Sequence, residues 1–229
     1  MPPTTRPAPS APAKSRKSAQ RREAILACAV DLFDRKGYVN TSLDDVAQAV
    51  GIKREALYYY FRSRSEILLA IIEPQAADLV GGLREVLASG APPTEQLRAA
   101  IRNHLKRFDR HCLEMTISLR DGIMGSNPEV GAAMQRTWKE YEQMWTELIR
   151  RGQADGSFTK PGDPKMVAFA ILGMCNWLSR WYSPRKSSTI DELIDIYYSM
   201  VTEGLLPRAA PDAPVKTRPA PRKRTSRAE

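Results

Sequence analysis

Apolar residues recur along most of this chain at the spacing of amphipathic α-helices, three or four positions apart. The first apolar stripe lies within residues 19–36 and comprises Ile25, Cys28, Leu32 and Phe33. Two short helices are expected next, one beginning near residue 42 and one at about residues 53–61, with Gly51 between them. No stretch of β-branched residues alternates with polar ones over the length of a strand. The pattern therefore predicts an all-α fold.

Capping residues divide the rest of the chain into longer helices. Ser63 and Thr189 each stand three residues before a glutamate, which is the capping-box pattern that opens a helix. An Asn or Asp followed directly by proline opens two more helices, at Pro128 and Pro164. The expected helices cover residues 64–89, 94–112, 114–122, 128–152, 164–182 and 189–204.

Composition separates these helices from two tails. Residues 1–18 and 207–229 are rich in Pro, Ala, Ser, Lys and Arg and poor in large apolar side chains, so we expect them to be disordered. Of the net charge of +9, residues 1–22 carry +6 and residues 207–229 carry +5, which leaves −2 for the chain between them. Basic tails favour contact with a polyanion at low salt, or serve as solubilising extensions. Between the tails, we expect a three-helix unit at residues 19–65 and a larger helical domain at residues 66–206.

Several classes of site find no support in the sequence. The three cysteines lie far apart and form no C-x-x-C pair, which argues against disulfides and cysteine-based zinc sites and is typical of a reducing cytoplasm. His104 and His111 would lie about 10.5 Å apart along one helix, too far to share a metal ion. The motifs of nucleotide-binding and zinc enzymes are absent, and no apolar run is long enough to span a membrane. We therefore expect a cytoplasmic protein that is not an enzyme and has no metal site, cofactor or membrane contact.

The two short helices have the residue pattern of a helix-turn-helix at about residues 42–61. Ala47 is small where the two helices approach, and Gly51 lies where the turn requires a positive φ, which disfavours residues with a Cβ atom. The core of the motif is formed by Val46, Val50, Ile52 and Leu57. At the start of the second helix, where a recognition helix meets base edges in the major groove, the outward-facing residues are Lys53, Arg54 and Glu55. We therefore expect this motif to bind DNA.

Residues 41–64, together with the preceding Phe33-x-x-Lys-Gly-Tyr38, resemble the signature of the TetR family of repressors. The resemblance implies a homodimer in which the last two long helices form a four-helix interface. It also implies a ligand cavity in the C-terminal domain. By the same resemblance, phosphates are held by Thr41, Tyr59 and Arg64, while the residues in the groove are Lys53, Arg54, Ala56 and Tyr58.

Two residues depart from the family's pattern. Lys53 replaces the usual Ser or Thr cap of the recognition helix, so we expect this end to be less well capped. Glu55 replaces a usual glycine, and its carboxylate repels phosphate but can accept a hydrogen bond from a cytosine amino group. The complete set of expected DNA-contacting residues is Thr41, Ser42, Lys53, Arg54, Glu55, Ala56, Tyr58, Tyr59 and Arg64.

Tryptophan and methionine dominate the C-terminal half of the chain. Such side chains either pack a core or line a large, adaptable apolar cavity. Residues 176–184 and the capped helix after them resemble the branch of the TetR family that senses acyl-CoA thioesters. Polar residues on these apolar helices are candidates to orient the polar group of a ligand. The expected ligand-binding residues are Met115, Arg120, Trp145, Asn176, Trp177 and Arg180.

The sequence thus predicts a ligand-responsive repressor that binds a palindromic operator as a homodimer and is released by a small hydrophobic or acyl-CoA effector. A regulator of drug efflux that senses aromatic or cationic compounds is an alternative within the same family. Outside it, the alternatives are a non-enzymatic helical interaction protein and a nonspecific DNA-packaging protein. An operator-binding assay distinguishes these classes, because only a specific regulator prefers one sequence over bulk DNA.

Overall fold

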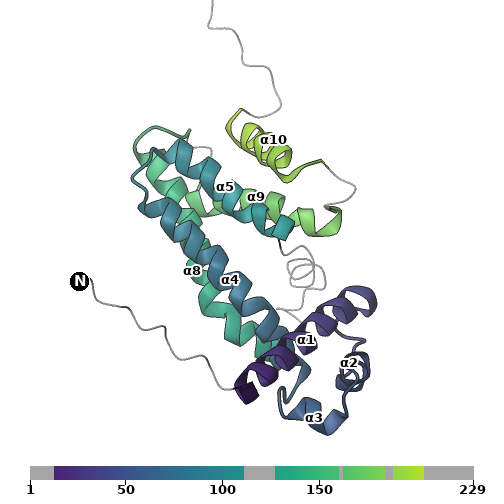
Figure 1. The fold of residues 1–229 in the computed structure, drawn as a ribbon. Coiled ribbons are helices and arrows are strands. Elements are labelled where there is room, and N and C mark those ends of the chain that lie inside the picture. The colour runs from purple at the N-terminus through teal and green to yellow at the C-terminus, as the bar shows by residue number, and fades with distance from the viewer. Residues whose placement is uncertain (1–12, 111–126, 160–161, 184–187, 204–229) are drawn as a thin grey trace, which may run out of the picture.

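The computed structural model describes residues 13–110, 127–159, 162–183 and 188–203, and every regular element in these ranges is helical. The elements are α1 (Ala13–Lys36), α2 (Leu43–Val50), α3 (Arg54–Tyr58), α4 (Arg64–Ala88), α5 (Pro93–Arg110), α8 (Pro128–Ala154), α9 (Pro164–Asn176), the 3-10 helix η1 (Trp177–Arg180) and α10 (Ile190–Thr202). Helices α1 to α3 form an N-terminal unit, and α4 and α8 run side by side from it to a C-terminal unit that contains α5, α9 and α10 (Figure 1). This arrangement confirms the all-α prediction.

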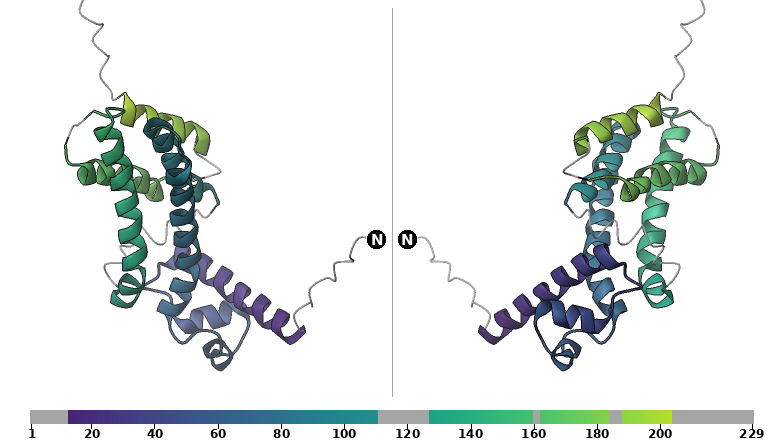
Figure 2. Two further views of the ribbon diagram at one scale, coloured as in Figure 1. Left: turned by 90° about the vertical axis from the view of Figure 1, so that its left-hand side faces the viewer. Right: turned by 90° about the vertical axis from the view of Figure 1, so that its right-hand side faces the viewer.

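Three helix boundaries differ from the predicted ones. Helix α1 begins at Ala13 rather than residue 19, so the prediction that residues 13–18 are disordered is wrong. Ala, Lys and Arg are strong helix formers, and they extend the helix beyond its packed half. Its N-terminal end projects to the side of the molecule (Figure 2). Helix α3 is shorter than predicted, and the helix predicted to reach residue 182 changes to 3-10 geometry at Trp177. The predicted helix at 114–122 lies outside the described residues, as does most of both tails.

None of the helices in the described ranges is long and apolar enough to cross a membrane.

The core of the N-terminal unit includes residues from α8. Buried side chains of α1, α2, α3 and α4 pack together with Val130 and Met134, which lie in the first turns of α8. Trp138, one turn further along α8, packs against this core and also against the core of the C-terminal unit. Helix α4 contributes to both cores, with Ile67 to Ala76 in the first and Leu79 to Leu83 in the second. The two units are therefore joined through two parallel helices rather than through one.

Asn127 adds a polar link at the same place. Its side-chain oxygen accepts from the Val130 N–H at 3.2 Å and so caps α8. Its Nδ2 donates to the Tyr38 hydroxyl at 2.7 Å and to Ser65 Oγ at 3.1 Å. One side chain thus fixes the start of α8 to the end of α1 and the start of α4.

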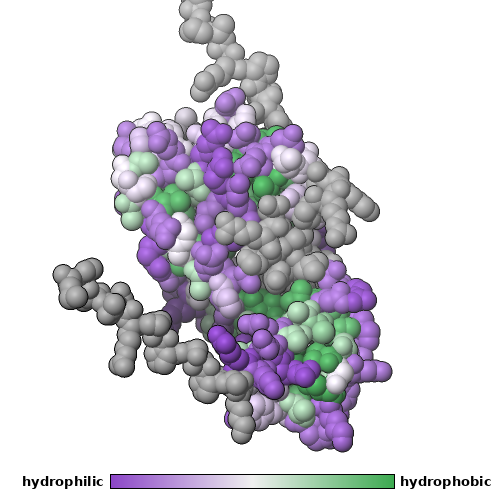
Figure 3. Space-filling view, in the orientation of Figure 1, coloured by the Kyte–Doolittle hydropathy of each residue, from purple (hydrophilic) through white to green (hydrophobic). Residues whose placement is uncertain are grey.

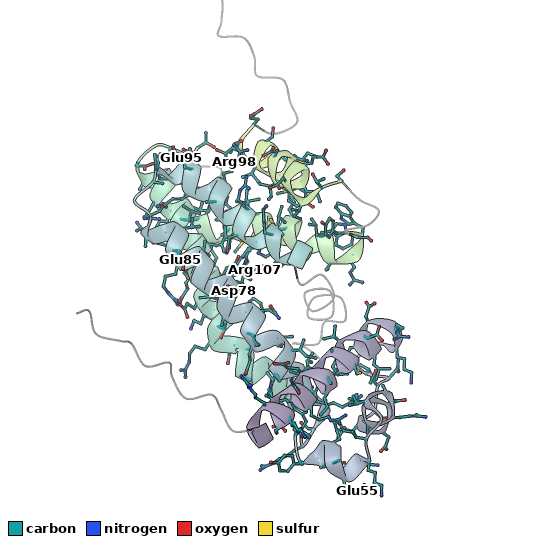
Figure 4. The ribbon with its side chains drawn as sticks, in the orientation of Figure 1. Glu55, Asp78, Glu85, Glu95, Arg98 and Arg107 are labelled. Atoms are coloured by element: carbon teal, nitrogen blue, oxygen red, sulfur yellow. The ribbon has the colours of Figure 1, made fainter. Side chains whose placement is uncertain are left out.

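Helices α4 and α5 pack closely where Gly82 faces α5. A Cβ atom at Gly82 would lie 2.2 Å from Asn103 Oδ1, so only glycine fits without movement. Beside it, the buried Arg107 of α5 pairs with Asp78 of α4 at 3.1 Å, and the two side chains face each other in Figure 4. This contact orients α5, and the turn of α5 that precedes Arg107 carries a buried histidine.

That residue, His104, links three helices inside the C-terminal core. Its Nδ1 lies 3.0 Å from the Tyr141 hydroxyl on α8, and its Nε2 lies 3.0 Å from Asn176 Oδ1 at the end of α9. Because a carbonyl oxygen only accepts, Nε2 carries the ring proton and Nδ1 accepts from Tyr141. Burial lowers the pKa of His104 from 6.5 to about 4, against the opposing effect of the Asn176 hydrogen bond. Burial also raises the pKa of Tyr141 above its usual value, so both groups are neutral at physiological pH.

We predict that Asn127→Ala lowers the free energy of unfolding by about 1–2 kcal/mol, because it removes a helix cap and two links to the N-terminal unit. Asn127→Asp is the matched variant, since it keeps the capping oxygen and removes the Nδ2 donor. Denaturant unfolding gives both values, and amide hydrogen exchange near Tyr38 should accelerate in both variants. A loss below about 0.5 kcal/mol in Asn127→Ala, the range of ordinary surface changes, would contradict this role.

His104 should make the protein sensitive to acid. Between pH 6.5 and about 4 the unfolded state binds a proton at this residue and the folded state does not. Stability therefore falls as the pH falls through this window, by about 2–4 kcal/mol in total. His104→Gln should lack this component, so the difference in unfolding free energy between the two proteins should change across the window. If that difference stays constant from pH 7 to pH 4, His104 is not the group responsible.

Candidate nucleic-acid interface and effector site

Local hydrogen bonds and one glycine define the start and the end of helix α2. Ser42 and Asp45 form a capping box at the start of α2: Ser42 Oγ accepts from the Asp45 N–H at 3.1 Å, and Asp45 accepts from the Ser42 N–H at 2.8 Å. Gly51 ends α2 with φ of 73°, in the left-handed region that favours glycine. A Cβ atom there would meet no neighbour within 4 Å. The backbone conformation, and not a lack of space, therefore requires glycine at this position.

Helix α3 is held from one side and exposed on the other. Leu57 and Phe61 are buried and anchor it to the core of the N-terminal unit. Lys53 occupies the N-cap position without a side-chain hydrogen bond, in agreement with the expectation that this end is poorly capped. The exposed residues are Lys53, Arg54, Glu55, Ala56, Tyr58 and Tyr59.

This exposed surface lies at one end of the molecule. Glu55 is at its tip, far from α5, α9 and α10 (Figure 4). In Figure 3 this end carries hydrophilic residues along its outer edge and an area of hydrophobic residues inside that edge. Tyr59 has 79% of its surface exposed, so its ring and hydroxyl are available to a partner. The structure thus brings together six of the nine expected DNA-contacting residues on one continuous surface.

Two of the remaining three have contacts that the sequence did not predict. The Thr41 hydroxyl was expected to hold phosphate, but it is fully buried and donates to the Gly37 carbonyl at 2.9 Å. Arg64 Nη1 donates to the carbonyl oxygens of Tyr38, Val39 and Thr41 at 2.8–3.0 Å. The Arg64 guanidinium also lies over the Tyr38 ring, 5.1 Å from its centroid. Both side chains therefore stabilise the loop between α1 and α2, and Ser42 serves as the cap of α2.

Sequence reasoning missed Arg62. This exposed residue lies beside a surface hollow of about 530 Å³ that is lined by residues 39–44, Arg54 and residues 62–64. The N-termini of α2 and α4 both border this hollow. Helix N-termini and arginine side chains attract anions, whereas the Asp44 carboxylate in the same lining repels them and is paired with Arg54. The part of the hollow beside Arg62 is therefore the part suited to a phosphate group. The signal in the sequence was the pair of arginines on either side of the Ser63 cap.

The expected ligand-binding residues do not form a single group in the described part of the chain. Trp145 is fully buried in the C-terminal core, and Asn176 bonds to His104. Trp177 and Arg180 are exposed on η1, and Trp177 has 62% of its surface exposed. Met115 and Arg120 lie outside the described residues. The buried residues His104 and Tyr141 belong to the same core, but nothing in the local sequence marked them as a pair.

Helix α8 carries two further buried donors near His104 and Tyr141. The indole N–H groups of Trp138 and Trp145 are shielded from solvent, and neither makes a hydrogen bond of good geometry within the described ranges. Trp145 nevertheless lies close to the Tyr141 hydroxyl, and its effect there opposes the burial that raises the pKa of Tyr141. Buried donors are usually paired, and leaving one unpaired costs about 1–3 kcal/mol. Both indoles lie on the same side of α8 as Tyr141, at a spacing of three to four residues. This side of α8 offers donors to a ligand oxygen in otherwise apolar surroundings.

Large apolar side chains are exposed on α9, η1 and α10. They are Met166, Phe169, Trp177, Trp181, Ile196 and Met200. The spacing of three residues between Met166 and Phe169, and of four between Ile196 and Met200, places each pair on one face of its helix, and exposed apolar faces are typical of protein interfaces.

Comparison with protein families assigns both parts of the chain. Residues 25–71 match the family model described as "Bacterial regulatory proteins, tetR family", and residues 90–205 match "Tetracyclin repressor-like, C-terminal domain". The HTH-type transcriptional repressor KstR2 of Rhodococcus jostii is 30% identical over 198 residues, which cover 86% of this chain and 96% of that protein.

Solved structures agree with this assignment. The TetR family regulator PfmR of Thermus thermophilus superposes with a TM-score of 0.72 at 31% identity, over 80% of this chain and 99% of its own. AibR, solved in complex with isovaleryl coenzyme A and operator DNA, has a TM-score of 0.69 at 26% identity, over 79% of this chain and 97% of its own. Together with the helix-turn-helix geometry, these matches show that the chain belongs to the TetR family of bacterial transcriptional regulators.

Proposed function

We propose that this regulator is a homodimeric repressor that binds a palindromic operator and is released from it by an acyl-CoA. The observation that carries the proposal is the similarity, over most of both chains, to AibR, whose structure contains both isovaleryl coenzyme A and operator DNA. Similarity to the KstR2 repressor supports the repressing role. Neither relative fixes which acyl group this protein recognises.

The surface of α3 supports the DNA-binding part of the proposal. Lys53 and Arg54 place cationic donors at the start of the recognition helix, where guanine and phosphate are reached. Glu55 beside them suits the amino group of a cytosine. Arg62 and the N-termini of α2 and α4 surround a hollow that suits the DNA backbone. Base contacts then come from α3, and backbone contacts from the residues around the hollow.

The exposed apolar residues of α9 and α10 support the dimer. Met166 on α9 and Ile196 on α10 are about half exposed, at 56% and 49%. A second copy of the same two helices covers these side chains in a symmetric interface. The dimer presents two copies of α3, which explains why the operator should be palindromic.

The effector part of the proposal rests on two sets of residues. On α8, the indole N–H groups of Trp138 and Trp145 suit a thioester carbonyl within an apolar environment. On η1, the exposed Trp177 ring and the Arg180 guanidinium suit the adenine and phosphates of coenzyme A. An acyl-CoA has both an apolar acyl chain and an anionic nucleotide, so it can use both sets.

Helix α8 also supplies a route from effector to DNA. The helix that carries Trp138 and Trp145 begins at Asn127, whose side chain bonds to Tyr38 and Ser65. An effector that prefers one position of α8 therefore changes the position of the N-terminal unit and the spacing of the two recognition helices. Only such a differential preference lets an effector change DNA affinity.

To test the proposal, the full-length protein first selects its operator from random DNA, and a panel of acyl-CoAs that includes isovaleryl-CoA is then titrated against the complex. We expect at least one acyl-CoA to lower operator affinity about thirty- to a hundredfold, which is a typical allosteric coupling. Trp177→Ala and Arg180→Ala should weaken this response, whereas Arg150→Ala, an exposed arginine of α8 paired with Glu147, should not. If aromatic or cationic compounds release the DNA and no acyl-CoA does, the efflux-regulator alternative is correct.

Substitution of Arg62 should affect DNA affinity, whereas substitution of Arg64 should mainly affect folding stability. Arg62→Ala should weaken binding to all DNA sequences alike and reduce the salt slope by about two per dimer, one for each protomer, without a change in unfolding free energy. Arg64→Ala should lower the free energy of unfolding by about 1–3 kcal/mol, because three carbonyls lose a charged donor. Salt-dependent DNA titration and denaturant unfolding separate the two effects. If Arg64→Ala unfolds like the wild type and loses only DNA affinity, its main role is phosphate contact.

A further inference from the structure

Asp44 and Arg54 form a pair across the turn of the helix-turn-helix. Asp44 lies in the first turn of α2 and Arg54 is the first residue of α3. Arg54 Nη1 donates to Asp44 Oδ2 at 2.7 Å, and Nη2 donates to the Tyr58 hydroxyl at 3.1 Å. The guanidinium carbon also lies 5.6 Å from the centroid of the Tyr58 ring. The guanidinium is thus held by groups from two helices at the centre of the DNA-facing surface.

The position of Asp44 needs an explanation. A carboxylate on a surface that meets a polyanion weakens binding, because it repels the phosphates. Asp44 is not needed as a cap, since Ser42 and Asp45 already form the capping box of α2. Its side chain is more than half exposed, and an exposed ion pair of this kind contributes little to folding. A carboxylate in the first turn of α2 also interacts favourably with the helix dipole, but that interaction does not require a contact with Arg54. Neither capping nor stability therefore accounts for the pairing of Asp44 with Arg54.

The presence of Asp44 is explained if it holds the Arg54 guanidinium in place. A free arginine on this surface is drawn to the nearest phosphate, and a phosphate contact carries no sequence information. Asp44 offsets the charge of Arg54 and holds one side of its guanidinium, and Tyr58 holds another. The guanidinium has five N–H donors, of which these contacts use two, so donors remain for the O6 and N7 atoms of a guanine.

We propose that Asp44 is a positioning residue that directs Arg54 to a guanine base and away from the DNA backbone. The inference rests on the proposed operator binding and adds the residue that determines specificity at one base pair of each half-site. In this arrangement the protein gives up some general DNA affinity and gains discrimination between sequences. The sign of both effects can be measured.

The test compares wild type with Asp44→Asn, which removes the charge and keeps the shape. Each full-length protein selects from a random DNA library, and affinities for the selected operator and for non-operator DNA are then measured at one salt concentration. We expect affinity for non-operator DNA to rise about two- to fivefold, because one anion per protomer is lost from the surface. We expect the ratio of operator to non-operator affinity to fall about tenfold, with relaxed preference at a single base pair per half-site.

Two controls separate positioning from a general charge effect. Asp31→Asn removes the same charge from an exposed ion pair with Arg35 on α1, and should leave the affinity ratio unchanged. In an Arg54→Ala background, Asp44→Asn should no longer change the ratio, because the residue through which Asp44 acts is absent. Tyr58→Phe removes the hydroxyl that is the second partner of Arg54. It should reduce the ratio of operator to non-operator affinity less than Asp44→Asn does.

The outcomes are distinguishable. If Asp44→Asn raises both affinities equally, Asp44 only repels phosphate and the inference is wrong. If the ratio falls as much in the Arg54→Ala background, Asp44 acts through another group and the inference is also wrong. If the wild type itself selects no palindromic sequence, it is the proposed operator binding that fails.

Discussion

Three helices of 24, 8 and 5 residues bury too little apolar surface to form a stable core alone. In this protein the missing surface comes from α4 and from the first turns of α8, where Val130 and Met134 are almost completely buried against α1 to α3. The N-terminal unit therefore cannot take up its folded position independently of α4 and α8. The polar link through Asn127 also fixes the orientation of this junction, because its two acceptors belong to different elements: Tyr38 to the loop after α1 and Ser65 to α4.

The recognition helix itself depends on this support. Helix α3 has five residues, no side-chain cap and two buried anchors, Leu57 and Phe61. Its orientation is consequently set by packing rather than by its own helical stability. Arg64 has a comparable role in the adjoining loop, because its guanidinium joins three carbonyl oxygens that would otherwise lack a common partner. A small change in the supporting helices is thus transmitted to the exposed residues of α3.

Prediction from the sequence was most successful for features of local structure that depend on one short segment, such as turns and helix caps. The positive φ of Gly51 and the caps at Ser63 and Thr189 depend on residues within a few positions, and the structure confirms each of them. The role of Arg64 could not be predicted in this way, since Arg64 bonds to carbonyls 23 to 26 positions earlier in the chain. Thr41 donates to a carbonyl only four positions earlier, but its complete burial depends on the packing of the unit around it. His104 and Asn176 are 72 positions apart, and only the packing of α5 against α9 brings them together. The roles expected of Met115 and Arg120 stay predictions.

The contribution of α8 to the N-terminal core has a consequence for protein engineering. Regulators with new inputs are commonly built by fusing the DNA-binding part of one relative to the sensor part of another, with the junction chosen from the linear order of the helices. A junction after α4 would leave Val130 and Met134 behind and replace them with the side chains of a foreign helix. The recipient core would then contain cavities or clashes, either of which destabilises it. A hybrid based on this protein should instead transfer residues 127–138 together with α1 to α4, so that the exchanged piece is continuous in space although it is interrupted in sequence.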